Sequence, residues 1–360
     1  MIDILRQIES WLSEQVMPLA SQIDADAAVL KQTLKQMGDR SWLALKVPQE
    51  LGGTGLDETE YNRIQISLAR ASGALTFLQT QHQSAVAKLA QCHNSSLKQE
   101  FLPKVATGRT LIGVGFSHLR RPGLPIVRAV ETTGGYLVTG EVPWITGYGF
   151  FTHFILGATL PDGRELYGLM PFQDEVQLSG GKITVSAPMQ LLAVSATNTV
   201  SATISQWFLP SDRLVNIYPP GTIHQSSRRN VLNHGFYALG AAYAGLDILQ
   251  SIAGKKKLEF INESWHALEQ ELKPIEQQAI ALISDSQATY AQKLQLRAKT
   301  IDLAQRCSLA AVMASSGAAN YLHSNAGRVY REAMLFSVSG QTTDVMEASL
   351  RSLWRYSHSK

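Results

Sequence analysis

The first hundred residues carry apolar side chains at helical spacing. The positions that recur three or four residues apart are Ile4, Ile8, Leu12 and Val16 and, further along, Tyr61, Ile64 and Leu68. Because residues at this spacing share one face of a helix, the pattern predicts amphipathic helices. The segment VPQELGGTGLDETE is interrupted by a proline and glycines and predicts a loop. Asp57 is expected to cap the helix that follows, with Glu60 completing a capping box.

The pattern changes from helical spacing to alternation near Thr110. Apolar Val200, Ala202 and Ile204 alternate with polar Ser201, Thr203 and Ser205. Strict alternation is typical of a strand that buries one face. Turn signals at Gly134-Gly135 and at Pro161-Asp162-Gly163 separate several such runs. The middle of the chain therefore predicts a β domain, built as a small barrel or sandwich.

Helical spacing returns after the dipeptide Pro219-Pro220. Small and apolar residues recur three or four apart at Ala238, Ala241, Gly245, Ile248 and Ile252, and a second long stretch, 275–322, is rich in alanine, glutamine and leucine. Both stretches predict bundle helices. We expect an α+β multidomain protein with an N-terminal α-helical domain (1–109), a middle β-barrel or β-sandwich domain (110–220) and a C-terminal four-helix bundle (221–360).

Composition and charge narrow the function classes. The 360 residues are 45% hydrophobic and carry a formal net charge of +3, and the longest lysine/arginine run is 255–257. These values indicate a globular protein and give no support to nucleic-acid binding. The two cysteines, Cys92 and Cys307, belong to no Cys/His cluster, so we expect no metal site, no disulfide and a reducing cytoplasm.

No membrane partner is expected either. The N-terminal segment MIDILRQIESWLSEQ is amphipathic and acidic, whereas a secretory signal is basic and then apolar. The longest apolar stretch, 237–249, is too short and too rich in glycine to cross a bilayer.

The stretch GEVPWITGY places a tryptophan and a threonine two residues apart. Side chains at positions i and i+2 of a strand point to the same face, so Trp144 and Thr146 are expected to face the same side. An indole ring and a hydroxyl on one face suit either a flat ligand or an ordinary core position.

Five segments, in order along most of the chain, resemble sequences of the acyl-CoA dehydrogenases. They are VPQELGGTGLDETEY, SLKQEFLPKVATGRTLIGVGFS, VTGEVPWITGYG, FLPSDRLV and GRVYREAMLFSVSGQTTDV. The third resembles the family's flavin-contacting strand, and the last resembles the Arg-x-x-Arg-Asp-Ala segment that precedes its catalytic loop. The chain is identified as an atypical member of this superfamily, with some similarity to its flavin-dependent monooxygenase branch.

The resemblance implies a flavin site. The cofactor-binding residues that it implies are Phe116, Ser117, Trp144, Ile145, Thr146 and Thr342. Trp144 is expected to lie against the flavin ring and the Thr146 hydroxyl near the ring's N5, where it polarises the atom that accepts hydride. Phe116 and Ser117 are expected at the pyrimidine edge, although Phe116 also suits a plain core position. The implied cofactor is FAD, with FMN or a reduced flavin as the alternatives.

The chain departs from the family at the catalytic base. Counted from Arg331 without gaps, the family's usual glutamate position is occupied by Gly340. Some members carry the glutamate on the first bundle helix, where the matching position is near Gly235 and the nearby carboxylate, Asp247, lies well past the relevant turn. Neither location supplies a carboxylate. His234 is a weaker candidate base, because a histidine near a helix start is more often a solvated residue.

The phosphate-binding segment also differs from the family. HLRRPGLP replaces the family's glycine- and serine-rich loop, so Arg120 and Arg121 are candidate phosphate ligands through charge, or else part of a solvated turn. The family's Arg-x-x-Phe-Gly segment is replaced by SIAGKKKLEFINESW, whose lysines indicate a solvated helix end.

Three functions stay open from the sequence. The first is an acyl-CoA dehydrogenase-like flavin oxidoreductase that acts on CH–CH groups, and the second is a flavin-dependent monooxygenase or oxidase, which needs no carboxylate base. The third is a non-catalytic homologue that binds a flavin, an acyl ligand or a partner. The resemblance implies a small-molecule substrate of the acyl-CoA class and a homodimer or homotetramer; small-residue helix faces at 238–245 and 311–317 are consistent with subunit pairing.

Overall fold

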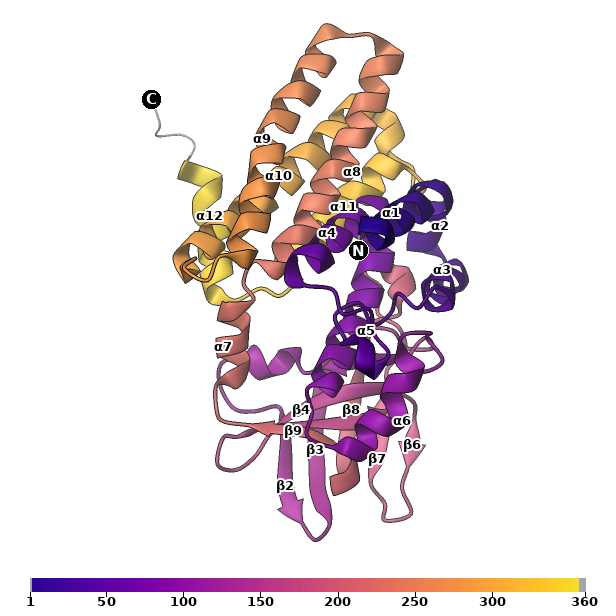
Figure 1. Cartoon of the computed structure of the whole chain (residues 1–360), viewed down its shortest axis with the longest axis vertical. Coiled ribbons are helices and arrows are strands. Elements are labelled where there is room, and N and C mark those ends of the chain that lie inside the picture. The colour runs from indigo at the N-terminus through magenta and orange to yellow at the C-terminus, as the bar shows by residue number, and fades with distance from the viewer. Residues whose placement is uncertain (1, 356–360) are drawn as a thin grey trace.

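The computed structural model describes residues 2–355, in which helices, then strands, then helices follow one another along the chain (Figure 1). The N-terminal helices are α1 (Ile2–Trp11), α2 (Ala20–Ala25), α3 (Ala27–Asp39), α4 (Glu58–Ala71), α5 (Gly73–Ala90) and α6 (Ser95–Val105). The predicted capping box is present at the start of α4. The Asp57 carboxylate accepts a hydrogen bond from the Glu60 N–H at 2.8 Å, and the Glu60 carboxylate accepts one from the Asp57 N–H at 3.1 Å.

The middle of the chain forms one mixed sheet of nine strands among the described residues. The strands are β1 (Ile112–Gly115), β2 (Val127–Thr132), β3 (Gly135–Ile145), β4 (His153–Thr159), β5 (Glu165–Pro171), β6 (Glu175–Val176), β7 (Lys182–Val185), β8 (Val200–Pro210) and β9 (Leu214–Tyr218). Their order is β6-β7-β8-β3-β2-β4-β5-β9, with β1 parallel to β4. The alternating segment predicted as a strand is β8, and the glycine turn is the β2–β3 hairpin, where Gly134 has φ +79°.

The C-terminal helices build the bundle. They are α7 (Thr222–Arg229), α8 (Asn233–Lys256), α9 (Glu259–Ser284), α10 (Tyr290–Ser315), α11 (Asn325–Val338) and α12 (Thr343–Arg355), of which α8 to α11 pack around one another. The stretch predicted over 275–322 is split between α9 and α10, because the chain turns at 285–289 and Thr289 caps a new helix. No helix among the described residues combines the length and apolar character needed to cross a membrane.

The small residues of α8 pack within the subunit. Ala238 and Ala241 are fully buried, and a Cβ at Gly245 would lie 2.7 Å from the backbone of Cys307 on α10. The small-residue face of α8 therefore allows close contact between two helices of one chain. It gives no support to the subunit interface that the spacing suggested.

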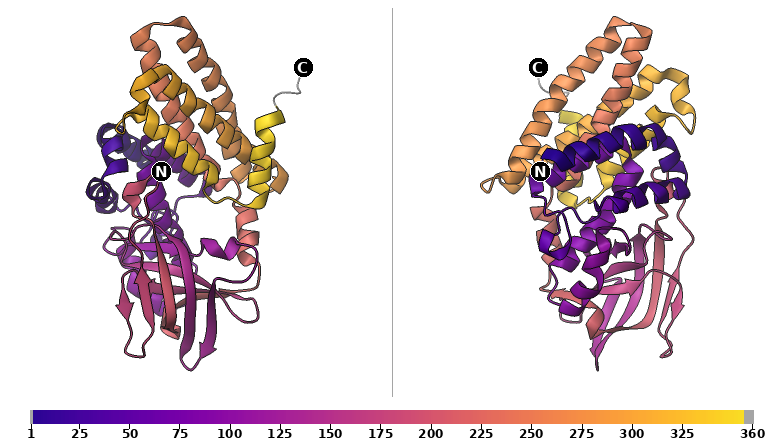
Figure 2. Two further views of the ribbon diagram at one scale, coloured as in Figure 1. Left: turned by 180° about the vertical axis from the view of Figure 1, so that it is seen from behind. Right: turned by 45° about the vertical axis from the view of Figure 1, so that its right-hand side comes forward.

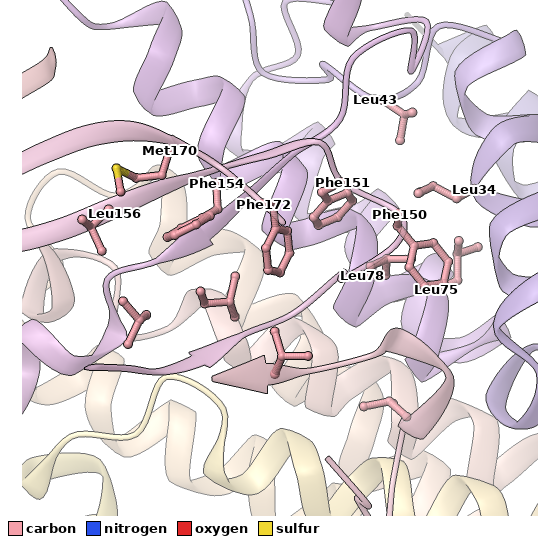
Figure 3. Close-up of a cluster of buried hydrophobic side chains, with 14 of the residues drawn as sticks. Leu34, Leu43, Leu75, Leu78, Phe150, Phe151, Phe154, Leu156, Met170 and Phe172 are labelled. Atoms are coloured by element: carbon pink, nitrogen blue, oxygen red, sulfur yellow. The ribbon is translucent and has the colours of Figure 1, made fainter. Parts of the chain in front are cut away.

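A row of phenylalanine side chains forms part of the main core between the sheet and the N-terminal helices (Figure 3). Its members are Phe150, Phe151, Phe154 and Phe172, and Figure 3 shows them between Met170 and Leu156 on one side and Leu75 and Leu78 of α5 on the other. Phe154 and Phe172 meet edge to face with ring centroids 5.4 Å apart, a favourable aromatic geometry. This core fixes α5 against the sheet.

His82 ties α5 to the strand that leads into the site. Its Nδ1 accepts a hydrogen bond from the Ile112 N–H at 3.0 Å, and its Nε2 lies 3.2 Å from the Val105 carbonyl oxygen. Burial lowers the pKa of His82 to about 4, so the ring is neutral at neutral pH and donates from Nε2. The end of α6 and the start of β1 are therefore both anchored to α5.

The sheet and the bundle lie at opposite ends of the molecule, with N-terminal helices alongside their junction (Figure 2). Helix α5 packs against β1, and α4 packs along α8. Residues of the sheet, α5, α8 and α11 are thereby brought to one junction, and the candidate site lies there.

Candidate active site

Two adjoining cavities lie at this junction. The first, here called the apolar cavity, has a volume of about 500 Å³ and is lined by residues of α5, α8, α11, the ends of β1 and β3, and the loop 191–194. The second, the polar cavity, has a volume of about 230 Å³ and is lined by Lys46 and by residues of α4, α5, α7, α8 and the turn before α12. Side chains common to both walls are Ser84, Arg120, His234 and Tyr237, together with Gly340.

Trp144 and Thr146 face the apolar cavity together, as their spacing indicates. The Trp144 side chain is 46% exposed at the wall, whereas Thr146 is only 5% exposed. The Thr146 hydroxyl lies 2.9 Å from that of Thr199, which fixes its direction. Ile145, between them, is fully buried in the core and lines neither cavity, so its side chain is turned away from any ligand there.

Phe116 and Ser117 reach the same cavity from the end of β1. Phe116 packs edge to face on Tyr167 with ring centroids 5.5 Å apart and also lines the cavity, so it combines a core contact with a place in the wall. The exposed Ser117 begins a short 3₁₀ helix, Ser117–Arg120. The structure therefore brings four of the six expected cofactor residues to one cavity: Phe116, Ser117, Trp144 and Thr146.

The last expected cofactor residue, Thr342, and the two candidate phosphate ligands, Arg120 and Arg121, lie in different places. Thr342 lines only the polar cavity, and its hydroxyl accepts a hydrogen bond from the Val345 N–H at 3.3 Å near the start of α12. Arg120 lines both cavities and donates from Nε to the Ser227 hydroxyl at 2.9 Å. Arg121 is exposed and lines neither cavity. Of the two arginines, only Arg120 is directed to the site.

The loop 191–194 is a part of the wall that sequence reasoning missed. Val194 adopts φ +53°, an unfavourable conformation for a β-branched residue, and is fully buried. The Asp24 carboxylate accepts a hydrogen bond from the Val194 N–H at 3.1 Å and pairs with Arg331 at 3.0 Å. An anchor from α2 and a cation from α11 thus hold this wall in place. Asp24, Val194 and Arg331 lie far apart in the sequence, so no local sequence pattern could predict these contacts.

Gly340 and His234 are in direct contact. Gly340 has φ +61°, and a Cβ built on it would lie 2.5 Å from His234 Nε2. The His234 ring also meets Tyr237 edge to face at 5.3 Å. His234 is therefore part of the cavity wall and not a solvated residue at the helix start. Its imidazole occupies the space that the Cβ of any other residue at position 340 would need.

The electrostatic surroundings keep His234 uncharged. Burial lowers its pKa well below the usual value, and the positive charges of Arg297 and Arg120 lower it further. Arg297 is only 1% exposed and donates from Nη2 to the Ser339 carbonyl at 2.7 Å. Burial also lowers the pKa of Arg297, to about 10. The ring at position 234 is a neutral hydrogen-bonding group at physiological pH.

No carboxylate lines either cavity within the described part of the chain. Asp247, the acidic residue of α8, pairs with Arg70 through two contacts of 2.7 and 2.6 Å and lies outside both walls. Glu332 on α11 is fully buried and binds Arg328 at 2.8 Å and the Gly73 N–H at 3.0 Å. The charged side chains in the walls are the cations Lys46 and Arg120.

Comparison with known proteins shows which fold and which sequences the chain resembles. Residues 2–109 match the family model described as the acyl-CoA dehydrogenase N-terminal domain. The short-chain specific acyl-CoA dehydrogenase of rat mitochondria is 22% identical over 256 residues, which cover 68% of this chain and 60% of that enzyme. A Bacillus subtilis acyl-CoA dehydrogenase is 24% identical over 264 residues, covering 71% and 68% of the two chains.

Solved structures match almost the whole chain. Glutaryl-CoA dehydrogenase of Mycobacterium smegmatis in complex with FADH2 superposes with a TM-score of 0.82 at 16% identity, covering 98% of this chain and 94% of that one. Butyryl-CoA dehydrogenase of Megasphaera elsdenii gives a TM-score of 0.78 at 15% identity, covering 98% and 97%. The three-part architecture is thus the acyl-CoA dehydrogenase fold. The sequence relatives and the N-terminal family model show that the chain is similar to the acyl-CoA dehydrogenases.

Proposed function

We propose that the apolar cavity holds the isoalloxazine ring of a flavin and that the protein is an acyl-CoA dehydrogenase-like flavin oxidoreductase. The observation that carries this proposal is the joint presentation of the Trp144 ring and the Thr146 hydroxyl to one cavity. A half-exposed indole offers a flat apolar face of the kind that a flavin ring covers. The M. smegmatis relative in complex with FADH2 has the same fold, which supports the choice of cofactor.

The residues of the cavity fit the ring half of such a cofactor. Trp144 would cover one face of the ring, and Phe116 and Ser117 would meet its edge from β1. A hydroxyl donates one hydrogen bond and accepts two, so Thr146 keeps capacity for a ligand while bonded to Thr199. A bound flavin supplies a two-electron acceptor or donor. FAD and FMN are both compatible with a ring bound in this way, because the two cofactors share the isoalloxazine ring.

The site is poorly arranged for removing a proton from carbon. Such a step needs a base whose pKa suits the task. Gly340 supplies none, and protonation of His234 is opposed by burial and by Arg297 and Arg120. We infer that the protein does not use the family's glutamate-dependent dehydrogenation. Because no carboxylate lines the walls within residues 2–355, a flavin-dependent monooxygenase or oxidase is the second candidate function.

Anaerobic mixing of the flavin-loaded protein with butyryl-, octanoyl- and palmitoyl-CoA tests this function. We expect the visible flavin absorbance to persist with all three thioesters and to bleach with dithionite, because electron transfer from the thioester needs removal of its proton. Dithionite is the control for a reducible, bound flavin. Rapid bleaching by any of the thioesters would show that a base operates in this site.

Subunit pairing is proposed through the outer face of α11 and α12. Large apolar side chains exposed there are Met334, Val338, Met346, Leu350 and Leu353. Met334 and Val338 also line the apolar cavity, so a second copy on this face would close that wall. Exposed large apolar side chains of this kind can be covered by a second subunit. We expect a homodimer or homotetramer, and sedimentation of the full chain as a monomer at micromolar concentration would contradict it.

A further inference from the structure

The polar cavity has an excess of positive charge. Lys46 and Arg120 are the charged residues of its wall, and no acidic side chain of the described chain lines it. Lys46 is already engaged, because it pairs with Glu58 of α4 and lies 5.3 Å from the centroid of the Tyr61 ring. Arg120 is the cation that lacks a matching acid.

Arg120 is a partly buried guanidinium with neutral partners only. Its Nε donates to the Ser227 hydroxyl at 2.9 Å, and it forms no ion pair with an acid in residues 2–355. Burial lowers its pKa, which reflects the cost of holding the charge away from water. A planar guanidinium carries five donors that match an oxyanion, and most of them are not used by Ser227. An anion placed beside Arg120 would offset this cost.

Two further side chains beside the polar cavity, Arg297 and His234, supply positive charge and hydrogen-bonding groups. Arg297 is fully buried, its Nε has no hydrogen-bond partner, and its positive charge acts on His234. The buried Nδ1 of His234 also lacks a partner, and this side chain lines both cavities. Of these two side chains, only His234 lies in the cavity wall, where its Nδ1 has hydrogen-bonding capacity left for a bound group.

The nearby acid does not neutralise Arg120. Glu165 accepts hydrogen bonds from the Ile223 N–H at 3.0 Å and from the Tyr167 hydroxyl at 3.1 Å, so it is committed to the start of α7. Its charge acts on Lys88, whose ammonium lies 3.8 Å from the centroid of the Tyr167 ring. The positive charge of Arg120 is therefore left for a ligand.

We propose that the polar cavity binds an oxyanion, a carboxylate or a phosphate, carried by the substrate whose apolar part occupies the adjoining cavity, with Arg120 as its principal ligand. The substrate is then an amphipathic acid. Ser84, Asn230, Asn233 and Thr342 line the same cavity and supply neutral hydrogen-bonding groups around the anion. This substrate class rests on the proposed function, which places cofactor and substrate in the apolar cavity.

Calorimetric titration of the full chain without flavin tests the proposal. The probes are hexanoate, hexyl phosphate and 1-hexanol, which share one apolar tail and differ in the head group. We expect at least one of the two acids to bind about tenfold to 100-fold more tightly than the alcohol, since hydrogen bonds to a charged group are the strong ones. The acid that binds more tightly identifies the oxyanion.

Arg120→Gln is expected to remove the preference for the acid. Arg128→Gln is the matched control, because Arg128 is exposed on β2, lines neither cavity and undergoes the same loss of charge. Equal affinities for acid and alcohol in the unmodified protein, or an unchanged preference in Arg120→Gln, would overturn the proposal. An equal loss in the Arg128 variant would attribute the effect to net charge and would also overturn it.

Separate titrations with FMN and riboflavin distinguish this proposal from the proposed function. If Arg120→Gln weakens the binding of FMN but not that of riboflavin or hexanoate, Arg120 serves the cofactor phosphate and the substrate subsite is wrong. If riboflavin fails to bind while hexanoate binds through Arg120, the flavin assignment fails and the anion subsite stands.

Discussion

Gly340→Ala is expected to lower the free energy of unfolding by about 2 to 3 kcal/mol, a large change for one methyl group. The new Cβ would lie 2.5 Å from His234 Nε2, closer than van der Waals contact allows. It would also occupy a residue with φ +61°, which an L side chain adopts at a cost of about 1 kcal/mol. Urea unfolding of the full chain, followed by helical circular dichroism, measures the difference.

The double variant Gly340→Ala with His234→Ala separates the two causes. Removing the imidazole relieves the collision but not the backbone strain, so the alanine at position 340 should then cost only about 1 kcal/mol. A Gly340→Ala variant as stable as the unmodified protein would mean that the imidazole does not lie against the glycine. A glutamate at position 340 would bring its Cβ against the same ring and would carry the same cost.

Trp144→Ala is expected to weaken flavin binding by about 30- to 100-fold, or roughly 2 to 3 kcal/mol. The indole is the largest flat apolar surface in the proposed ring site, and its half-exposed position leaves it accessible to a ligand. Quenching of flavin fluorescence on binding measures the dissociation constant. Because Trp144 is not deeply buried, we expect the variant to keep its stability.

Trp144→Phe is the control for this substitution, because it keeps an aromatic face of smaller area. We expect it to lose less than tenfold in affinity. Equal affinities in the alanine variant and the unmodified protein would remove Trp144 from the flavin site, whatever the phenylalanine variant does.

Patterns among residues close together in the sequence were sufficient to predict much of the fold. The capping box at Asp57 and the β2–β3 turn depend on residues within four positions of one another, and both are present. Trp144 and Thr146 were expected on one side because strand geometry alternates, and both face the apolar cavity.

The parts of the site that sequence reasoning missed depend on contacts between distant segments. Arg297 lies within α10, where neighbouring residues give no indication that its side chain is buried beside His234. Asp24 reaches Val194 across the interface between α2 and the cavity loop. The environment of His234 was misjudged for the same reason: a histidine near a helix start gives no sign that Gly340 packs on its ring.

Titration of the unmodified protein with FAD, FMN and riboflavin tests the central claim most directly, since all three contain the isoalloxazine ring. We expect saturable binding of all three with one site per chain, because the ring that they share is the part proposed to lie against Trp144 and Thr146. Failure of all three flavins to bind to the folded protein would contradict the account.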